Sequence, residues 1–251
     1  MIYTKQQIVA STQVGADAKL SVMGLFGIVE SAITEGMGVL KLDGMTVRRK
    51  YNAFWVFTKN RIKIMSNVEW GETVCVESFI SNVSSAKMVV DTALKTMQGD
   101  VIAYSVCEMC VLDVATERIR RTSSVGVDEH VVAEQPQMPV EFEKIDDVDL
   151  PMIETVKVRS TNIDFSQHCN NVEYLRFLLN TYTVRELVNR PIREIEVCYV
   201  NQAYEGDELT VHKLSGESRD TLSIKKDGKT VIKCAILRGS GASTQNGFAS
   251  L

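Results

Sequence analysis

The sequence predicts an α+β protein built from two similar halves, each made of one long apolar helix and an antiparallel sheet. Two segments, starting near positions 21 and 171, repeat apolar residues at the spacing of one helix face. Each is followed by alternating segments that are separated by Gly-containing turns, which is the pattern of hairpin-connected strands. An acidic stretch with prolines lies between the two series and indicates a linker.

The first half is expected to open with a strand over residues 3–12 and a helix that Ser21 caps and that runs to about Met37. This helix is apolar around much of its circumference, so we expect other elements to enclose it. A loose, Gly-rich connection should follow over residues 34–53. Strands are then expected at Phe54–Thr58, Arg61–Met65, Thr73–Asn82, Ala86–Met97 and Asp100–Leu112.

The second half repeats this order, with a strand over Glu154–Ser160, a polar loop and a helix over Asn171–Asn189. Strands are expected after it at Arg193–Asn201, Glu208–Glu217, Asp220–Lys226 and Lys229–Arg238. In domain terms, we expect an N-terminal unit over 1–127, an acidic linker over 128–151, a C-terminal unit over 152–240 and a flexible tail over 241–251.

An internal repeat relates the two halves. Aligning the helix starts gives an offset of 150 residues (from 21 to 171), and aligning the turns at Gly71 and Gly206 gives 135 (from 71 to 206). A long apolar helix followed by an antiparallel sheet, twice, is the outline of a tandem (double) hotdog, in which each of two sheets wraps its own central helix. Two unrelated α+β domains are the alternative architecture.

Composition narrows the possible functions. A net charge of −4 over 251 residues argues against nucleic-acid binding. No apolar run approaches the length of a membrane span and the first residues lack a signal-peptide core, so we expect a cytoplasmic protein that does not enter a membrane. Cys107 and Cys110 form a C-x-x-C inside a predicted strand, where their side chains would point to opposite faces. We therefore expect no metal site and no cofactor.

The densest chemistry lies just before the second helix. A carboxylate, a hydroxyl and an imidazole stand two residues apart at Asp164, Ser166 and His168, and Asn170 and Asn171 follow. The N-terminus of a helix carries unpaired backbone N–H groups and a partial positive charge, which could stabilise an oxyanion. The same residue types are also ordinary turn and capping residues, so a purely structural role stays open.

The repeat suggests that the two halves differ in function. At the offset of 150, the three residues Asp164, Ser166 and His168 fall on Val14, Ala16 and Ala18, and at the offset of 135 Gln202 falls on Asn67. The first half therefore lacks the acid and the imidazole at these positions. This asymmetry suggests that one half carries out a reaction and the other half holds the substrate.

These segments resemble those of the acyl-acyl-carrier-protein thioesterases. The family pattern Asp-x-Asn-x-His-Val-Asn-Asn-x-x-Tyr is similar to residues 164–174 here, Asp-Phe-Ser-Gln-His-Cys-Asn-Asn-Val-Glu-Tyr. Trp55-Val56 and Val111-Leu112-Asp113, which precedes the basic run 118–121, also look like the family. Three residues depart from it: Ser166 replaces Asn, Cys169 replaces Val, and Gln202 stands where the family has Glu.

The resemblance implies hydrolysis of fatty acyl thioesters held on acyl carrier protein, which releases free fatty acid and ends chain elongation. It implies attack by water, with Asp164 as the general base directly or through His168, and with Ser166 and Gln202 orienting water or the carbonyl. Backbone N–H groups near Asn170 and Asn171 would hold the oxyanion. A Cys169 nucleophile paired with His168 is the rival chemistry.

The acyl chain is expected to lie along Met23, Phe26, Trp55 and Phe57. An acidic carrier protein is expected to bind at one of three basic clusters, which are Arg48-Arg49-Lys50, Arg118-Ile119-Arg120-Arg121 and Lys225-Lys226. A homodimer is possible. An acyl-CoA thioesterase, a non-catalytic acyl-binding hotdog protein and, less well supported, a hydratase acting on enoyl thioesters are the alternative functions.

Overall fold

The computed structural model describes residues 1–134, 140–146 and 149–239. The first half contains β1 (Ile2–Ile8), η1 (Ser11–Gln13), α1 (Val22–Val39), α2 (Gly44–Tyr51), β2 (Ala53–Ile64), β3 (Thr73–Val83), β4 (Met88–Thr96), β5 (Val101–Asp113) and β6 (Ile119–Arg120). The second half contains β7 (Met152–Lys157), η4 (Ser160–Asn162), α3 (Asn171–Leu179), α4 (Val184–Asn189), β8 (Ile192–Tyr199), β9 (Glu208–Ser215), β10 (Arg219–Lys226) and β11 (Lys229–Arg238). The short turns η2 (Thr122–Val125) and η3 (Glu129–Val131) lie between the halves.

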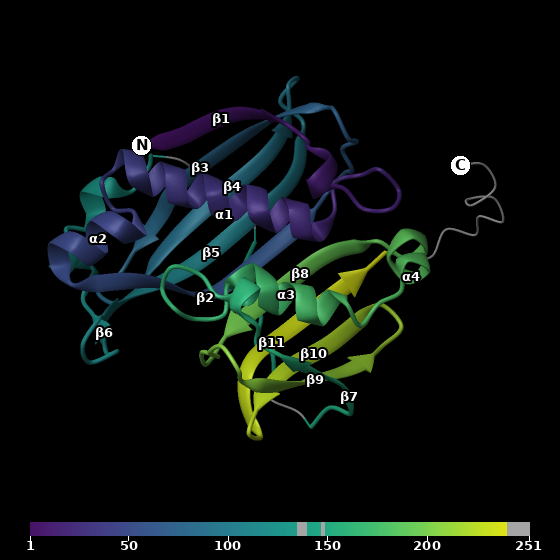
Figure 1. Cartoon of the computed structure of the whole chain (residues 1–251). Helices are drawn as coiled ribbons and strands as arrows, with labels where there is room; N and C mark the ends of the chain where they lie inside the picture. The colour runs from purple at the N-terminus through teal and green to yellow at the C-terminus, as the bar shows by residue number, and fades with distance from the viewer. Residues whose placement is uncertain (135–139, 147–148, 240–251) are drawn as a thin grey trace.

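The strands form one continuous sheet rather than two separate ones. Within the described residues, eleven strands pair in the order β1-β3-β4-β5-β2-β8-β11-β10-β9-β7, with β6 beside β5. The halves join edge to edge where β2 runs antiparallel to β8, with Ile62 opposite Ile195. Figure 1 shows α1 lying across the strands of the first half and α3 across those of the second. The α+β tandem hotdog predicted from the sequence is confirmed, with its two sheets fused.

The central helix α1 begins where the sequence predicts. The Ser21 hydroxyl accepts a hydrogen bond from the Gly24 N–H at 3.0 Å and so caps the helix. Its buried face, which includes Leu25, Ile28 and Ile33, packs against the sheet. By length and composition alone α1 could cross a membrane, so the expectation that no apolar run approaches that length is wrong. Here it is the core helix of the first half.

A charged cluster covers the seam between the halves on the side of the sheet away from the helices. Arg61 of β2 donates from Nε to Glu194 of β8 at 2.7 Å, and its Nη1 lies 3.3 Å from Glu196. The linker joins this cluster, because Glu143 pairs with Arg61 at 2.7 Å and with Arg219 at 2.5 Å. The described part of the acidic linker is therefore packed across the seam.

Local structure differs from the predictions in three places. The Gly-rich connection contains the helix α2, whose start is fixed by Asp43 accepting from the N–H groups of Met45 and Thr46. The strands predicted at 54–58 and 61–65 are one strand, β2, with a bulge between Phe57 and Lys59. The single helix predicted over 171–189 is divided into α3 and α4, because Thr183 opens a new helix with a capping box to Glu186.

The predicted tail over 241–251 lies outside the described residues, as do linker residues 135–139 and 147–148. The proposed domain limits at 127, 151 and 240 stay predictions. The structure adds that the two halves share a sheet and a covered seam, so they are packed as one body at β2 and β8.

Candidate active site

The loops that precede α1 and α3 have the same backbone structure. Each contains a 3₁₀ turn, an isolated β-bridge and one non-glycine residue with positive φ, Ala18 (58°) and Gln167 (70°). The N–H of Gly15 donates to the Lys19 carbonyl at 2.8 Å, and the N–H of Asp164 donates to the His168 carbonyl at 3.0 Å. The two loops therefore superpose residue for residue.

This correspondence corrects the alignment of the halves. The capping residues Ser21 and Asn170 are equivalent, so the offset before the helices is 149 residues (from 21 to 170) and the predicted 150 is wrong by one. The counterparts of Asp164, Ser166 and His168 are therefore Gly15, Asp17 and Lys19. The offset of 135 holds, because Leu20 N–H donates to Val68 and Cys169 N–H to Ala203, each at 2.8 Å. The first half still lacks the acid and the imidazole at the matching positions.

Asp164, Ser166 and His168 form a short hydrogen-bonded chain. Asp164 Oδ1 accepts from the Ser166 N–H at 2.7 Å and from the Ser166 hydroxyl at 2.5 Å. The Ser166 Oγ lies 3.3 Å from His168 Nδ1. The carboxylate therefore reaches the imidazole through Ser166 rather than directly, and the loop itself fixes the order acid, hydroxyl, imidazole.

Aromatic residues from both halves enclose the imidazole. Phe54 of β2 lies 6.3 Å from the His168 ring and Tyr204 meets it edge-on at 5.1 Å, both measured between ring centroids. Burial lowers the pKa of His168 below its ordinary value, while the charges of Asp164 and Glu117 act in the opposite direction. The ring is therefore neutral at neutral pH and able to accept a proton.

The chain of Asp164, Ser166 and His168 lies at a cavity of about 250 Å³ at the seam. Asp164, Ser166, His168, Asn171 and Gln202 all face it, as do Trp55 and Phe57 of β2. The Trp55 ring is held in place by a hydrogen bond from Nε1 to the Leu42 carbonyl at 2.8 Å. The structure thus brings together residues that are up to 147 positions apart in the chain (from 55 to 202).

The N-terminus of α3 offers one backbone donor rather than two. The N–H of Asn170 already donates to the Asn162 carbonyl at 2.8 Å, so the expectation that it could hold an oxyanion is wrong. The Asn170 side chain caps the helix by accepting from Val172 N–H at 2.8 Å. Within the described residues the Asn171 N–H has no such acceptor, and Asn171 lines the cavity. Asn171 is therefore the candidate oxyanion donor.

Cys169 also lines the cavity but is a poor nucleophile. Its side chain is buried, and burial together with the charge of Glu173 raises the pKa of the thiol to about 12. The thiolate is the reactive form of cysteine, and it is scarce at neutral pH when the pKa is this high. The geometry therefore does not favour the rival cysteine chemistry.

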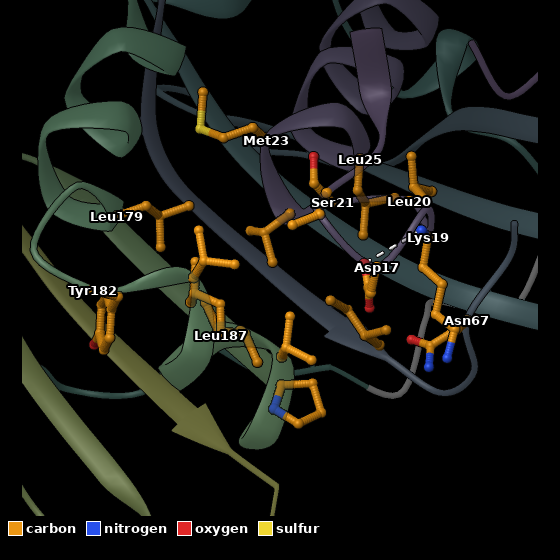
Figure 2. A pocket seen from close by; sticks show the side chains of 18 of the residues that line it. Asp17, Lys19, Leu20, Ser21, Met23, Leu25, Asn67, Leu179, Tyr182 and Leu187 are labelled. Carbon is orange, nitrogen blue, oxygen red and sulfur yellow. Dashed lines mark hydrogen bonds between the residues drawn. The ribbon is translucent and has the colours of Figure 1, made fainter. Parts of the chain in front are cut away.

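A second cavity of about 390 Å³ occupies the equivalent place in the first half. Gly15, Asp17 and Lys19 of the first loop line it, where Asp164, Ser166 and His168 line the other cavity. Figure 2 shows Met23, Leu25, Leu179 and Leu187 converging on it, with Asp17, Lys19 and Asn67 at one rim. We call it the twin cavity.

The four residues predicted to hold the acyl chain do not share one cavity. Trp55 and Phe57 line the cavity of His168, whereas Met23 lines the twin cavity. Phe26 is buried in the core and lines neither of the two cavities. The structure therefore does not bring the four residues together in one of these cavities, because α1 presents its N-terminal turn to the opposite end of the seam, and their role in holding an acyl chain stays a prediction.

Sequence reasoning missed several aromatic residues of the site. Tyr174 and Tyr199 line the cavity, and the Tyr174 hydroxyl accepts from the Ala203 N–H at 2.8 Å beside Gln202. Phe54 and Tyr204 enclose the imidazole. Tyr174 closes the loop motif and was visible in the sequence. The other three lie on distant strands and loops, so no local pattern identifies them.

Comparison with known proteins shows which proteins this chain is similar to. Residues 145–236 match the family described as the acyl-ACP (acyl carrier protein) thioesterase C-terminal domain. The chain is 23% identical to oleoyl-acyl carrier protein thioesterase 2, chloroplastic, of Arabidopsis thaliana, over 94% of the chain and 72% of that protein. It is 19% identical to the palmitoyl-acyl carrier protein thioesterase of the same plant, over 79% of the chain and 52% of that protein.

Solved structures show the same fold along nearly the whole chain. An acyl-ACP thioesterase from Bacteroides thetaiotaomicron superposes with a TM-score of 0.87 at 20% identity, covering 95% of this chain and 98% of that one. The 12:0-ACP thioesterase from Umbellularia californica superposes with a TM-score of 0.80 at 16% identity, covering 95% and 97%. Residues 145–236 thus match the acyl-ACP thioesterase C-terminal domain family, and the resemblance to the acyl-ACP thioesterases that was identified from the sequence is confirmed.

Proposed function

We propose that this protein is a thioester hydrolase that releases fatty acids from acyl carrier protein, with its reaction centre at Asp164, Ser166 and His168. The observation that carries the proposal is the hydrogen-bonded chain of these three side chains in a cavity at the seam of the two halves. The family match over residues 145–236 supports the substrate class. We place the activity in the cytoplasm.

The hydrogen bonds indicate which nitrogen of His168 acts. Ser166 has one hydroxyl proton, and it donates that proton to Asp164 at 2.5 Å. His168 Nδ1–H then donates to Ser166 Oγ, which leaves Nε2 unprotonated and able to accept a proton from water. Asp164 and Ser166 hold the ring in this tautomer and stabilise the imidazolium as it forms. Asp164 therefore acts on water through His168 rather than directly.

The remaining groups act on the thioester itself. Attack by water on the carbonyl carbon produces an oxyanion, for which the Asn171 N–H and the positive end of α3 provide stabilisation. Gln202 also lines the cavity and offers an amide donor. When the tetrahedral intermediate breaks down, the imidazolium of His168 returns its proton to the departing thiolate, and neutral His168 is regenerated.

Two groups of basic residues, on α2 and beside β6, lie near the cavity of His168. Arg120 donates to the Tyr51 carbonyl at 2.7 Å, which holds the segment 118–121 against the end of α2. Ile119 lines the cavity of His168, so this basic surface borders its mouth. In contrast, Lys225 and Lys226 are engaged with Asp149 and Asp207, at 3.6 and 2.6 Å. We assign carrier-protein docking to Arg48, Arg49, Lys50, Arg118 and Arg121.

The proposal is tested by incubating the purified protein with acyl-ACP and a thiol-trapping dye. We expect release of free thiol and of one fatty acid per thiol. Release of thiol from acyl-CoA but not from acyl-ACP would mean that the acyl group is carried on coenzyme A. The reaction would still be thioester hydrolysis. No thiol release, with fatty acid still bound on extraction, would overturn hydrolysis in favour of an acyl-binding protein. Ser166 and Gln202 stand where the family pattern has Asn and Glu, and these two departures are the feature that favours an acyl-binding protein.

A further inference from the structure

The twin cavity has the size of a ligand site, and the mechanism above does not use it. Its volume is about 390 Å³, within the range of about 300–1,000 Å³ that is typical of small-molecule sites. As far as the described residues line them, the twin cavity and the cavity of His168 have no residue in common. A ligand in the twin cavity would therefore occupy a site separate from the candidate reaction centre.

Apolar side chains from both halves form most of the wall of the twin cavity. Met23 and Leu25 come from α1, Ile64 from β2, Leu179 from α3 and Leu187 from α4. Figure 2 shows Leu179 and Leu187 on one side of the hollow and Leu25 on the other. An apolar cavity of about 150 Å³ is enough to hold a benzene ring. This larger apolar space therefore suits a flexible alkyl chain, and Met23 can adapt its shape to one.

One rim of the twin cavity is polar and carries a cation that is free to bind a ligand. Lys19, which is equivalent to His168, lies at this rim beside Asn67 (Figure 2). Lys19 is half-buried, and in the described part of the chain no hydrogen bond or ion pair holds its ammonium group. The other cation of the lining, Arg176, is already paired with Glu173 at 3.1 Å. The charge of Lys19 is therefore available to an anionic group at one end of the apolar space.

Asp17 is the opposing charge at this rim. It is exposed, and its Oδ1 accepts a hydrogen bond from the backbone N–H of Lys19 at 3.3 Å, which turns the carboxylate back onto its own loop. No ion pair joins it to the ammonium group of Lys19 within residues 1–134, where both lie. Among the described charged residues that line the twin cavity, Lys19 and Arg176 are positive and Asp17 is negative. The rim therefore favours an anionic head group over a cationic one.

We propose that the twin cavity is a second, non-catalytic binding site for a medium-chain fatty acid, with the alkyl chain against Leu179 and Leu187 and the carboxylate at Lys19. Burial removes the chain from water, and the ammonium group of Lys19 gives the carboxylate a charge-assisted hydrogen bond. The first loop has no acid and imidazole in line, so a molecule held here is not a substrate of the reaction. The inference uses only the lining of the twin cavity and does not rest on the proposed hydrolysis.

The first experiment titrates decanoate into protein with ¹³C-labelled methionine methyl groups and follows the signal of Met23 by NMR. Met23 lines the twin cavity, whereas no methionine is among the described residues that line the cavity of His168, so this signal reports on one site. We expect a saturable shift, an affinity roughly tenfold lower in Lys19→Gln, and no shift in Leu187→Trp, which fills the apolar end. The control Lys63→Gln should bind like the wild type, because Lys63 is exposed and points to the opposite face of β2 from Ile64.

A second measurement tests the head group and uses a variant at an exposed position. Asp17→Asn should bind decanoate about two- to fivefold more tightly, because it removes the opposing charge, and decylamine should bind the wild type more weakly than decanoate. Equal binding of the two amphiphiles, or an unchanged affinity in Lys19→Gln, overturns the fatty-acid site. A protein that hydrolyses acyl-ACP without any response of Met23 overturns this inference alone. A protein that binds decanoate here but hydrolyses no thioester overturns the proposed function alone.

Discussion

The two loops before α1 and α3 share a backbone but carry different chemistry. Each has the same 3₁₀ turn, the same bridge and the same left-handed residue, Ala18 in one and Gln167 in the other. Backbone strain is often taken as a sign of function. Here it occurs equally in the loop without an imidazole, so it belongs to the scaffold. The difference between the two loops therefore lies in the side chains that each loop presents, not in the backbone.

The two cavities repeat this contrast on a larger scale. Where one has Asp164, His168 and Tyr199, the other has Gly15, Lys19 and Ile64. The twin cavity is the larger, about 390 against 250 Å³. A duplicated fold thus keeps two hollows at its seam, but only one of them has an acid and an imidazole in line.

The largest expected effect comes from exchanging the imidazole. His168→Ala should lower kcat about 10²- to 10⁴-fold, because it removes the proton acceptor of the reaction. Its matched control is Lys19→Ala, the equivalent position of the first loop, which should keep the wild-type rate. The measurement is thiol release from acyl-ACP by folded protein. Equal losses in the two variants would mean that the two loops do not differ in function.

The next effect concerns the basic surface of the first half. The double variant Arg49→Glu with Lys50→Glu should raise KM for acyl-ACP roughly tenfold, because it opposes an acidic carrier. KM for a short acyl-pantetheine thioester, which has no carrier protein, should not change. The same KM increase for both substrates would show that α2 acts on the cavity rather than on the carrier. Lys225→Glu is the control, since Lys225 is already paired with Asp149.

Substitutions of the two helix-capping residues test whether the two loops have the same structural role but different functions. Ser21→Ala and Asn170→Ala should each lower the free energy of unfolding by about 1 kcal/mol, since both caps accept a hydrogen bond from the first turn of a helix. Only Asn170→Ala should also lower kcat, because it loosens the turn that presents the Asn171 N–H. Denaturant unfolding and kinetics on the same preparations separate the two effects. A kcat loss in Ser21→Ala as well would place the first loop in the reaction.

The smallest effect is expected at the cysteine beside His168. Cys169→Val introduces the residue that the family pattern has there and removes the thiol. Hydrolysis should persist, because the pKa of about 12 keeps the buried thiol protonated at neutral pH. Steady-state rates with acyl-ACP provide the test. Abolished turnover in a folded Cys169→Val protein would reinstate the cysteine as nucleophile.

The sequence by itself predicted the features that depend on neighbouring residues. Helical spacing and the Ser21 cap located α1, alternation located most strands, and three residues two positions apart marked the loop of the candidate active site. These signals are local because helices, hairpins and caps are stabilised by contacts within a few residues of the chain. The internal repeat was recognised because both halves show the same local patterns in the same order, and the repeat in turn predicted the tandem fold.

Tertiary structure decided how the halves meet. Only the backbone hydrogen bonds fixed the offset at 149 rather than 150, because a helix start is ambiguous by one residue in sequence. Pairing of β2 with β8 carried Trp55 and Phe57 to the second loop and left Met23 at the opposite end of the seam. Such juxtapositions depend on strand register and helix packing over more than a hundred residues, which no local pattern encodes.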